Sequence, residues 1–381
     1  MTEKTLDQLR QDIDRIDDQV HRLLNERAEC ARAVADVKVR EFEAAQQFEG
    51  DQENSGSAQQ LLFYRPEREA QVLRRIKEVN QGPLADDTVA HIFREIMSAC
   101  LALEKPMQVA YLGPEGTFTQ AAAIKHFGHA VNSHPQTTID AVFSRVESGE
   151  CHYGVVPVEN STEGMVSHTL DNFMSSPLKI CGEVELRIRL HLLASEDTLS
   201  AASDGGLRCI CAHQQALAQA KSWLDAHYPN VERRAVSSNA EAAKLAGDEV
   251  GVAAVAGDIA AQRYGLVYMA ENIEDLSDNS TRFLIIGRED VSASGEDKTS
   301  IIISARNRPG ALFALLQPFY REGIDLTRID TRPSRTETWA YAFFIEFEGH
   351  QQDPQIADIL KELEEHSNLL KVLGSYPKAA L

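Results

Sequence analysis

The sequence contains no long apolar run. Its first residues, MTEKTLDQLRQDIDRIDD, are charged throughout and lack the hydrophobic core of a secretion signal. No later stretch approaches the roughly 18 uninterrupted apolar residues that a membrane-spanning helix needs. We therefore expect a cytoplasmic protein that is neither secreted nor bound to a membrane.

Clustered cysteines and net positive charge are also lacking. The six cysteines form no C-x-x-C pair and have no histidine at zinc-binding spacing, so we predict reduced thiols and no metal. The formal net charge of −20 argues against nucleic acid as a partner, because polyanions bind basic surfaces. If the substrates are anions, arginine and lysine side chains must be gathered locally.

The chain has enough apolar residues to bury real cores. Hydrophobic residues make up 43% and charged residues 25% of its 381 residues, which is typical of folded soluble proteins. This length exceeds one compact core and fits two or three domains. We predict three modules that differ in their periodicity.

The first module, residues 1–105, has the periodicity of helices. Apolar side chains recur at alternating spacings of three and four over residues 5–39, which predicts one long helix. A second helix begins at Pro66, and a third ends before Pro106. Residues 41–62, rich in Gln, Glu, Gly and Ser, are interpreted as a mobile insertion. Two shorter helices cannot cover the first, so its uncovered seam predicts a homodimer or a higher homo-oligomer.

Residues 106–290 alternate between short apolar strands and alanine-rich helices. This alternation predicts an α/β domain with largely parallel sheets. A small polar linker follows, and residues 298–381 then show the order β-α-β-β-α-β of a ferredoxin-like α+β unit. The predicted fold class is therefore a multidomain chain of an all-helical, an α/β and an α+β module.

Arg27 occupies an otherwise apolar seam position of the first helix. A charge in a helical seam is costly unless it is paired, so Arg27 needs an anion. Lys38 lies within about 20° of Arg27 on a 3.6-residue helix, whereas Arg10 lies about 100° away. From these residues alone, the anion is either a protein carboxylate such as Glu69, which would fix helix register, or a ligand.

The residues around Arg27 resemble a known family. The pairs L-R at 9–10, E-R at 26–27 and V-K at 37–38, together with R-P-E-R-E at 65–69, resemble the all-helical chorismate mutase family over about residues 5–104. Chorismate is a dicarboxylate. Its rearrangement to prephenate needs a compact conformer and stabilisation of the charge at the breaking ether, but no nucleophile.

This resemblance implies roles for individual residues. Arg10, supplied from the partner helix, and Arg27 would clamp the carboxylates of chorismate. Lys38 would donate to the ether oxygen. Glu69 would hold the substrate hydroxyl, and Arg68 would support the neighbouring chain.

Three further positions concern the same site. Cys100 matches a substrate-contact position of the family or is plain core. Arg65 stands where the family often has an acid, and Glu104 stands where it often has an amide that donates to the ether. A carboxylate donates only when it is protonated, and burial favours protonation. We therefore predict that mutase activity falls as pH rises and that Glu104→Gln flattens the profile.

Three polar motifs flank predicted strands of the α/β module. G-P-E-G-T-F-T places Thr117 and Thr119 at a helix start, whose free N–H groups favour an anion, or it is only a turn. P-V-E-N-S-T-E packs polar residues 159–163 into one turn, which is either a site or a capped helix start. S-D-N-S-T-R-F puts Thr281 and Arg282 directly before a buried strand.

Together, these motifs resemble the prephenate dehydratase family over roughly residues 107–290. The resemblance implies a two-lobed fold similar to periplasmic binding proteins, with the ligand in the cleft between the lobes. We place one lobe at about 107–184 plus 266–290 and the other at 185–265.

The same resemblance assigns residues to this cleft. Thr281 matches the threonine that the family needs for activity, Arg282 would anchor a carboxylate, and Phe283 would pack the cleft wall. The opposite side would be lined by Glu159, Asn160, Ser161 and Thr162. Prephenate loses carbon dioxide and hydroxide together, so the site must hold a dianion and stay dry. The identity of the general acid stays open, and His213 is either a site residue or structural.

Two motifs mark the C-terminal module. R-P-G-A-L-F contains Gly310, Ala311, Leu312 and Phe313, and I-D-T-R-P contains Asp330, Thr331, Arg332 and Pro333. Both resemble the ACT regulatory domain, in which such segments bind phenylalanine at a domain dimer interface. A glycine before a helix lets the backbone approach a small ligand, and free N–H groups suit its carboxylate. The alternative is a helix cap and a turn that serve only dimerisation.

The three resemblances imply an enzyme of phenylalanine biosynthesis. It would convert chorismate to prephenate and prephenate to phenylpyruvate, with L-phenylalanine as feedback inhibitor. Neither reaction requires a metal or an organic cofactor, and the sequence shows no cofactor fingerprint. Two alternatives remain: a prephenate dehydratase whose helical module only dimerises, and a non-catalytic amino-acid-sensing binding protein. The second alternative leaves Arg27, Lys38 and Glu69 unexplained.

Overall fold

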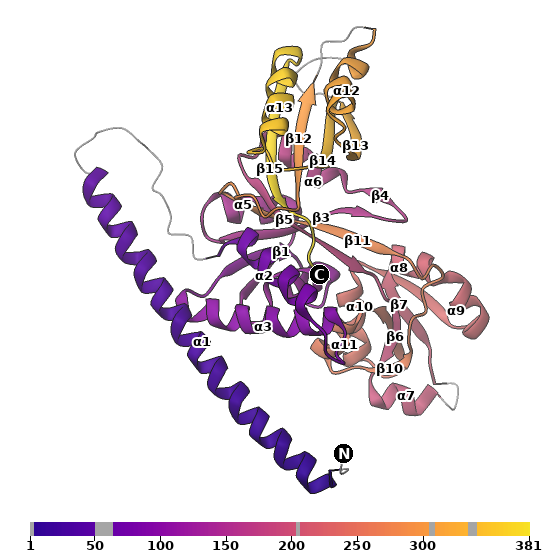
Figure 1. The fold of residues 1–381 in the computed structure, drawn as a ribbon. Helices are drawn as coiled ribbons and strands as arrows, with labels where there is room; N and C mark the ends of the chain where they lie inside the picture. Colours follow the sequence, from indigo (N-terminus) through magenta and orange to yellow (C-terminus); the bar gives the residue numbers. More distant parts are fainter. Residues whose placement is uncertain (1–3, 50–63, 203–205, 305–308, 334–340) are drawn as a thin grey trace. The chain divides into compact units, whose positions relative to one another are not determined.

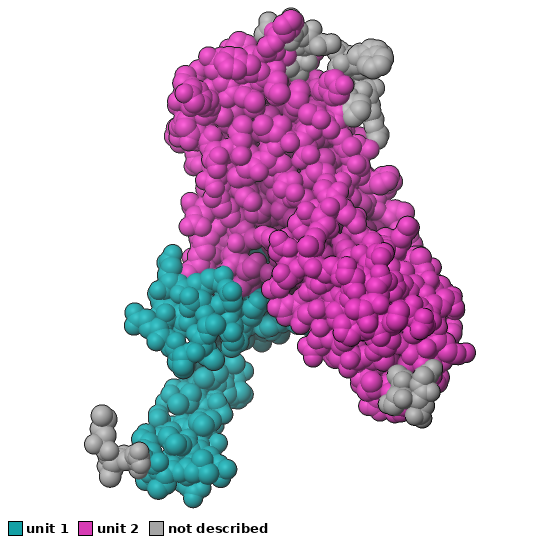
Figure 2. Space-filling view, turned by 90° about the vertical axis from the view of Figure 1, so that its right-hand side faces the viewer, with its two compact units in different colours: residues 1–65, 76–107, 127–131 teal, residues 66–75, 108–126, 132–381 magenta. Residues whose placement is uncertain are grey.

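The computed structural model describes residues 4–49, 64–202, 206–304, 309–333 and 341–381. The chain forms two compact units, which are coloured separately in Figure 2. The first unit comprises residues 1–65, 76–107 and 127–131, and the second comprises 66–75, 108–126 and 132–381. The second unit therefore contains nearly all of the α/β module and the whole C-terminal module.

The first unit is built on two helices, α1 (Leu6–Glu49) and α3 (Asp86–Glu104), which contact each other. Helix α2 (Pro66–Val79) begins at Pro66 as predicted, and only its last residues belong to this unit. The apolar seam of α1 is exposed in the single chain along most of its length, at Leu6, Leu9, Ile13, Ile16, Val20 and Leu23. This exposed row is the uncovered seam that the periodicity predicted.

Helix α1 is longer than we predicted. We expected the helix to end near residue 39 and residues 41–62 to form a mobile insertion, but α1 continues to Glu49. Residues 41–49 are rich in glutamate, alanine and glutamine, which are strong helix formers as well as polar or small residues. The rest of the expected insertion, 50–62, lies outside the described residues. No helix in the described ranges is both long and apolar enough to cross a membrane.

The first lobe of the second unit is a mixed six-stranded sheet (Figure 1). Its strands in spatial order are β2 (Asn132–Gln136), β1 (Gln108–Leu112), β3 (Tyr153–Asn160), β11 (Ser280–Gly287) and β5 (Lys179–Arg187), with β4 (Gly164–Met165) paired to β3. Strand β1 runs parallel to β2 and β3, whereas β11 is antiparallel to β3 and β5. The helices of this lobe are α4 (Phe118–Phe127), α5 (Ile139–Glu147) and α6 (Ser167–Ser175).

The second lobe is a five-stranded sheet with its own core. Its strands in spatial order are β10 (Val267–Ala270), β6 (His191–Ala194), β9 (Val252–Ala256), β7 (Cys209–His213) and β8 (Glu232–Val236). Strand β7 is parallel to β8 and β9, and β6 is antiparallel to β9 and β10. Its helices are α7 (Glu196–Ala202), α8 (Gln214–Gln219), α9 (Lys221–His227), α10 (Asn239–Asp248) and α11 (Asp258–Tyr264).

Two of our expectations for these lobes need correction. We expected largely parallel sheets, but strands β6, β10 and β11 pair only antiparallel. We also placed residues 266–279 in the first lobe, whereas β10 pairs with β6 in the second sheet. The reason is that the chain returns to the first lobe only after β10, and β11 then enters the first sheet between β3 and β5.

The C-terminal module has the predicted order of elements. These are β12 (Asp297–Ser304), α12 (Ala311–Glu322), β13 (Leu326–Pro333), β14 (Tyr341–Glu348), α13 (Pro354–His366) and β15 (Leu369–Pro377). The strands form one antiparallel sheet in the order β13-β14-β12-β15. This is the β-α-β-β-α-β arrangement of a ferredoxin-like unit.

The C-terminal sheet packs against the first lobe. Buried side chains of Ile180 and Leu284 from the first sheet share one apolar cluster with Ile302, Phe344 and Tyr376 from the C-terminal sheet. Burial of apolar surface is the main stabilising contribution in protein cores. The two sheets are therefore held together by a common core.

Candidate active sites

Lys38 and Glu104 meet in the first unit. The Lys38 Nζ lies 3.7 Å from the Glu104 Oε2, and the two side chains are 25% and 9% exposed. Burial raises the pKa of the Glu104 carboxyl, although the neighbouring Lys38 ammonium opposes this shift. Within the described residues, Glu104 Oε2 accepts no hydrogen bond. A protonated Glu104 could therefore donate to a ligand beside Lys38.

The two other cations of α1 to which the mutase resemblance gave a role, Arg27 and Arg10, are not engaged with that pair. Arg27 is half-buried and forms no ion pair with a described residue. Arg10 is 68% exposed, and its Nη1 lies 3.9 Å from the Asp7 Oδ1. Cys100 is buried on α3. The sequence left two partners open for Arg27, a protein carboxylate or a ligand. No carboxylate pairs with Arg27 in the described part of the chain.

Arg68 and Glu69 lie in the first turn of α2, within residues 66–75 of the second unit. The Arg68 side chain is exposed and the Glu69 side chain is half-buried. Arg65 is exposed at the N-cap position of the same helix, where it makes no capping hydrogen bond. The helix start therefore presents Arg65 and Arg68 to solvent.

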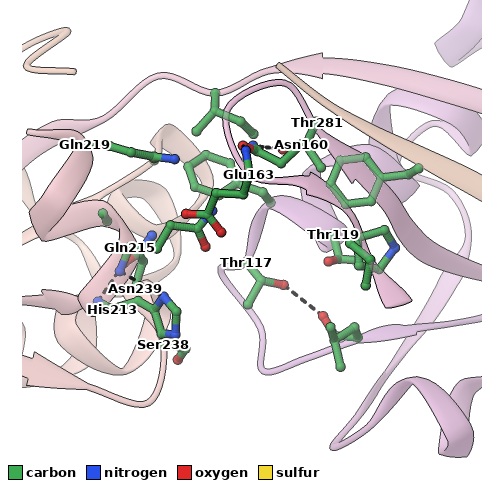
Figure 3. Close-up of a pocket in the computed structure, with 18 of the residues that line it drawn as sticks. Thr117, Thr119, Asn160, Glu163, His213, Gln215, Gln219, Ser238, Asn239 and Thr281 are labelled. Atoms are coloured by element: carbon green, nitrogen blue, oxygen red, sulfur yellow. Dashed lines mark hydrogen bonds between the residues drawn. The ribbon is translucent and has the colours of Figure 1, made fainter. Parts of the chain in front are cut away.

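A cleft of about 500 Å³ lies between the two lobes of the second unit. This is within the usual range of small-molecule sites. Figure 3 shows its polar lining on both sides, with Thr117 and Thr119 from the first lobe and His213, Gln215, Ser238 and Asn239 from the second. Apolar side chains from the first lobe complete the wall, among them Phe118, Met165 and Phe283.

Asn160 and Thr281 form the polar centre of the first-lobe side. They are cross-strand partners of β3 and β11, and the Asn160 Nδ2 donates to the Thr281 Oγ1 at 2.8 Å. The Asn160 Oδ1 accepts from the backbone N–H groups of Thr162 and Glu163, which fixes the orientation of the amide. Because the Thr281 oxygen accepts from Asn160, its own proton remains available to donate into the cleft.

The cleft lining contains no arginine or lysine among the described residues. This corrects our expectation that such side chains must gather at every anionic site. The starts of α4 and α10 border the cleft instead, at Thr117, Phe118 and Thr119 and at Ser238 and Asn239. The first N–H groups of a helix have no intrahelical acceptor and favour an anion.

Arg282 does not line the cleft. Its guanidinium forms two hydrogen bonds to Glu346 of β14, at 2.7 and 2.8 Å, and lies 3.2 Å from Glu183. Successive side chains of a strand point to opposite faces, so Thr281 and Phe283 reach the cleft while Arg282 points to the other face of the sheet. The expected role of Arg282 as a carboxylate anchor in the cleft therefore needs correction.

The polar turn at 159–163 is divided in the same way. Asn160 and Glu163 line the cleft, whereas Glu159, Ser161 and Thr162 do not. Ser161 and Ser280 join β3 to β11 through two hydrogen bonds. The Thr162 hydroxyl donates to Asn160, so it supports the amide that holds Thr281. Ser161 and Thr162 therefore support the site from behind its lining.

Sequence reasoning missed most of the second-lobe side. Gln215, Gln219, Ser238 and Asn239 all line the cleft. The segment S-S-N-A-E at 237–241 carries a detectable signal, because Ser238 caps α10 by accepting from the Glu241 N–H while Glu241 accepts from Ser237. A side-chain N-cap after a strand indicates a helix start at the edge of the sheet where ligands bind.

Two sets of contacts join the lobes beside the cleft. The Gln219 Nε2 donates to the Thr162 Oγ1 at 3.2 Å, and Gln219 accepts from Asn279 at 3.1 Å. Arg263 of α11 forms an ion pair with Glu115, the Nε–Oε2 distance being 2.6 Å. These polar contacts hold the two lobes together around the cleft.

The two C-terminal motifs lie at the start of α12 and on β13. Gly310 caps α12 with a φ of 81°, a conformation that glycine adopts without strain. The Phe313 side chain is 70% exposed, and Leu312 is also exposed. Asp330, Thr331, Arg332 and Pro333 lie on β13. Burial raises the pKa of the Asp330 carboxyl, with Arg328 opposing the shift.

Family models match three consecutive parts of the chain. They describe chorismate mutase type II at residues 9–105, prephenate dehydratase at 109–291 and the ACT domain at 299–365. These are the three families that the motifs resemble, in the expected order.

Whole-chain relatives agree with these matches. The chain is 56% identical over 373 residues to a bifunctional chorismate mutase/prephenate dehydratase of Stutzerimonas stutzeri, with 98% of both chains covered. A protein of the same name from Pseudomonas aeruginosa shows the same identity and coverage. The solved structure of the prephenate dehydratase from Arthrobacter aurescens, in complex with L-Phe, is 34% identical with a TM-score of 0.65, over 71% of this chain and 90% of that chain. The chain belongs to the bifunctional chorismate mutase/prephenate dehydratase family.

Proposed function

We propose that the chain converts chorismate to prephenate at its helical module and prephenate to phenylpyruvate in the interlobe cleft. We assign residues 1–105 to the mutase, 106–290 to the dehydratase and 298–381 to the regulatory domain. The observation that carries the dehydratase assignment is the hydrogen bond from Asn160 to the Thr281 hydroxyl at the cleft surface. We further place the protein in the cytoplasm.

In the dehydratase reaction, Thr281 acts on the departing hydroxyl group. Prephenate breaks its ring C–C bond to one carboxylate, which leaves as carbon dioxide. The electron pair of that bond makes the ring aromatic and expels the ring hydroxyl. The Thr281 O–H donates to this departing oxygen as negative charge develops on it, which lowers the barrier. Asn160 holds the Thr281 oxygen from the opposite side.

The dianion is held by backbone and amide groups. The N–H groups at the starts of α4 and α10 would donate hydrogen bonds to the carboxylates, and the side-chain amides of Gln215 and Asn239 would donate further ones. The Asn239 Oδ1 accepts from the His213 N–H at 2.9 Å, which orients its amide nitrogen. The apolar wall around Phe118 and Phe283 limits water near the reacting ring.

In the mutase reaction, the cations of α1 stabilise the charge that develops on the ether oxygen. Arg27 and Arg10 would hold the carboxylates, and Lys38 and a protonated Glu104 would both donate to the ether. The exposed seam of α1 supports a dimer in which the partner helix supplies Arg10. Glu69 would hold the substrate hydroxyl, with Arg68 supporting the neighbouring chain and Cys100 in contact with the substrate.

The C-terminal domain would bind L-phenylalanine and lower dehydratase activity. The glycine-capped start of α12 and the Asp330–Pro333 segment of β13 support this assignment. The related structure from Arthrobacter aurescens is a complex with L-Phe. Phenylalanine is the transamination product of phenylpyruvate, so it is the chemically expected feedback signal.

One experiment tests both activities together. The purified full chain is given chorismate, and prephenate and phenylpyruvate are followed with and without phenylalanine. We expect both products in sequence, with phenylpyruvate formation suppressed by phenylalanine. No turnover would favour a binding protein, and consumption of prephenate alone would favour a dehydratase with a helical dimerisation module.

The variant Thr281→Val tests the proposed donor. It keeps the shape of the side chain but removes the proton, so we expect dehydratase kcat to fall roughly 10²–10³-fold, the usual effect of removing one transition-state donor. Thr281→Ser restores the hydroxyl and should keep most of the activity. Mutase activity of the same variants is the folding control. Equal dehydratase rates in the valine and serine variants would remove Thr281 from the chemistry.

A further inference from the structure

Two cross-strand Arg–Glu pairs, one in each sheet, contact each other where the C-terminal domain meets the first lobe. Arg282 and Glu159 are opposite residues of β11 and β3 in the first lobe. Arg328 and Glu346 are opposite residues of β13 and β14 in the C-terminal sheet. Each arginine makes its closest ion pair with the glutamate of the other sheet: Arg282 with Glu346, and Arg328 with Glu159.

The distances show that the four groups form one cluster. The Arg282–Glu346 pair has two parallel hydrogen bonds, at 2.7 and 2.8 Å. The weaker contacts within each sheet remain, with Arg282 Nε 3.7 Å from Glu159 and Arg328 Nε 3.6 Å from Glu346. Bidentate arginine–carboxylate pairs are the most directional ion pairs in proteins. The cluster therefore fixes the orientation of both sheets at this point.

The cluster is poorly accessible to water. The side chains of Arg282 and Glu346 are 12% and 8% exposed, and those of Arg328 and Glu159 are 22% and 25% exposed. Glu183, which is 3% exposed, joins Arg282 to Lys298 of β12, whose Nζ lies 2.8 Å away. Charges with little solvent interact strongly, and removing one partner leaves an uncompensated charge.

The first-lobe half of the cluster lies next to the catalytic pair. Glu159 precedes Asn160 on β3, and Arg282 follows Thr281 on β11. The register pairs Thr281 with Asn160 and Arg282 with Glu159. Because alternate side chains face opposite sides, the cleft-facing pair and the cluster-facing pair share the same short backbone segment. A backbone displacement at Glu159 or Arg282 is therefore transmitted directly to Asn160 or Thr281.

The C-terminal half lies next to the proposed effector motif. Arg328 is two residues before Asp330 on β13, and its Nη1 lies 3.9 Å from the Asp330 Oδ2. Asp330 belongs to the segment proposed to bind phenylalanine. A ligand ammonium that binds Asp330 competes with Arg328 for that carboxylate, and so changes the balance of contacts by which Arg328 holds Glu159.

We propose that Arg328 and Glu346 of the C-terminal domain are positioning residues of the dehydratase site, and that their ion pairs with Glu159 and Arg282 carry the effector signal to Asn160 and Thr281. This proposal rests on the proposed function. It also gives Arg282 and Glu159 a role other than binding substrate.

The test compares Arg328→Gln with Arg328→Lys in the full chain. The glutamine variant removes the charge, so we expect dehydratase kcat to fall about tenfold while KM for prephenate changes less than about twofold. It should still bind phenylalanine, as measured by calorimetry. Phenylalanine should, however, inhibit its dehydratase activity less than half as strongly as that of the wild type. The lysine variant keeps a cation at Glu159 and should recover most of kcat. Glu346→Gln is the second variant, made on the other sheet and expected to show the same pattern.

A matched control is Arg321→Gln. Arg321 makes a comparable two-point ion pair with Glu362 on the exposed side of the same domain, at 2.6 and 3.2 Å. It should leave kcat and inhibition unchanged. Mutase activity and the unfolding temperature are recorded for every variant, so that a general loss of folding is recognised.

The outcomes separate this proposal from the proposed function. A wild-type chain without dehydratase activity would contradict the function itself. An active, inhibited wild type whose Arg328→Gln and Glu346→Gln variants match Arg321→Gln would overturn the positioning role alone. The cluster would be only a structural contact if Arg328→Lys failed to recover kcat. The same conclusion would follow if kcat fell in proportion to the unfolding temperature across the variants. An active wild type that phenylalanine does not inhibit would overturn the signalling part.

Discussion

The two proposed sites, at helix α1 and in the interlobe cleft, offer different groups to the same kind of ligand, a dicarboxylate with a reacting six-membered ring. Helix α1 presents the side-chain cations Arg10, Arg27 and Lys38. The cleft has no arginine or lysine in its described lining and presents helix starts, amides and hydroxyls. Side-chain cations carry full charge but are strongly hydrated when exposed, whereas backbone N–H groups are fixed by the fold and need no reorientation.

The two reactions explain why side-chain cations suit one proposed site and backbone N–H groups the other. The mutase site must hold a flexible substrate in one compact conformer and stabilise charge at the ether, which suits several cations acting from different directions. The dehydratase releases a carboxylate as neutral carbon dioxide. A full cation on that carboxylate would stabilise the ground state that has to be lost, and weaker dipoles avoid this cost. The difference thus follows from where the negative charge goes during each reaction.

The largest expected effect comes from removing a mutase cation. Arg27→Ala should lower mutase kcat/KM roughly 10³-fold, because this half-buried cation, which forms no ion pair with a described residue, is proposed to bind a carboxylate of chorismate. Steady-state assays with chorismate measure this change, and dehydratase activity on prephenate should stay within about twofold.

The control for this variant is Arg22→Ala on the same helix. Arg22 is exposed and pairs with Glu26, and exposed pairs of this kind contribute little to stability. It should leave both activities unchanged. If Arg27→Ala retained full mutase activity, side-chain cations would not distinguish the two sites, and Arg27 would serve only the helix seam.

The sequence predicted the elements well where local pattern decides them. The start of α2 at Pro66, the seam of α1 and the order of the C-terminal elements all followed from periodicity and turn residues. The end of α1 did not, because polar helix formers such as glutamate and glutamine are also typical of loops. The lobe boundary near residue 266 was missed because strand pairing across the chain is not a local property.

The candidate site was predicted unevenly for a similar reason. Thr281, Asn160 and Phe283 stood in motifs and do line the cleft. Arg282 stood in the same motif, yet strand alternation turns it to the other face, toward Glu346. The N–H groups at the starts of α4 and α10 are marked in the sequence only indirectly, by the helix-start residues around Thr117 and Ser238. Charged side chains are therefore easier to recognise in a sequence than backbone groups, whose position depends on the fold.

An intermediate effect is expected from adding a methyl group where the two lobes meet beside the cleft. A methyl group added at Gly257 would lie 2.6 Å from the Phe118 ring of the opposite lobe. Gly257→Ala should therefore push Phe118 into the cleft or the lobes apart, raising KM for prephenate about tenfold, in line with an overpacking cost of ~1–3 kcal/mol. Mutase kinetics should not change.

Gly247→Ala is the matched control in the same lobe. It adds a methyl group with only ordinary contacts, 3.6 Å from the Tyr264 carbonyl oxygen, and it lies within helix α10. It should be neutral or slightly stabilising. If both glycine variants had the same KM for prephenate, the dehydratase cleft would not depend on the fit between the lobes. The contrast between a cleft fixed by the fold and a mutase site built from side-chain cations would then weaken.

The smallest expected effect concerns Glu104, which we propose acts in its protonated form. Burial raises the pKa of Glu104, with Lys38 opposing. The protonated, donating form therefore persists at higher pH than for an ordinary glutamate, and it is lost as pH rises through the raised pKa. Mutase kcat should fall several-fold over that interval, while the dehydratase measured on the same chain supplies the reference profile.

Glu104→Gln decides whether this proton belongs to the mechanism. The amide donates at every pH, so the variant should keep its activity where the wild type loses it, and the two profiles should diverge on the alkaline side. A decline shared by both would belong to another group. Identical profiles would leave Lys38 as the sole proposed donor to the ether. The mutase would then rely on side-chain cations alone, in full contrast to the dehydratase cleft with its backbone N–H groups, amides and hydroxyls.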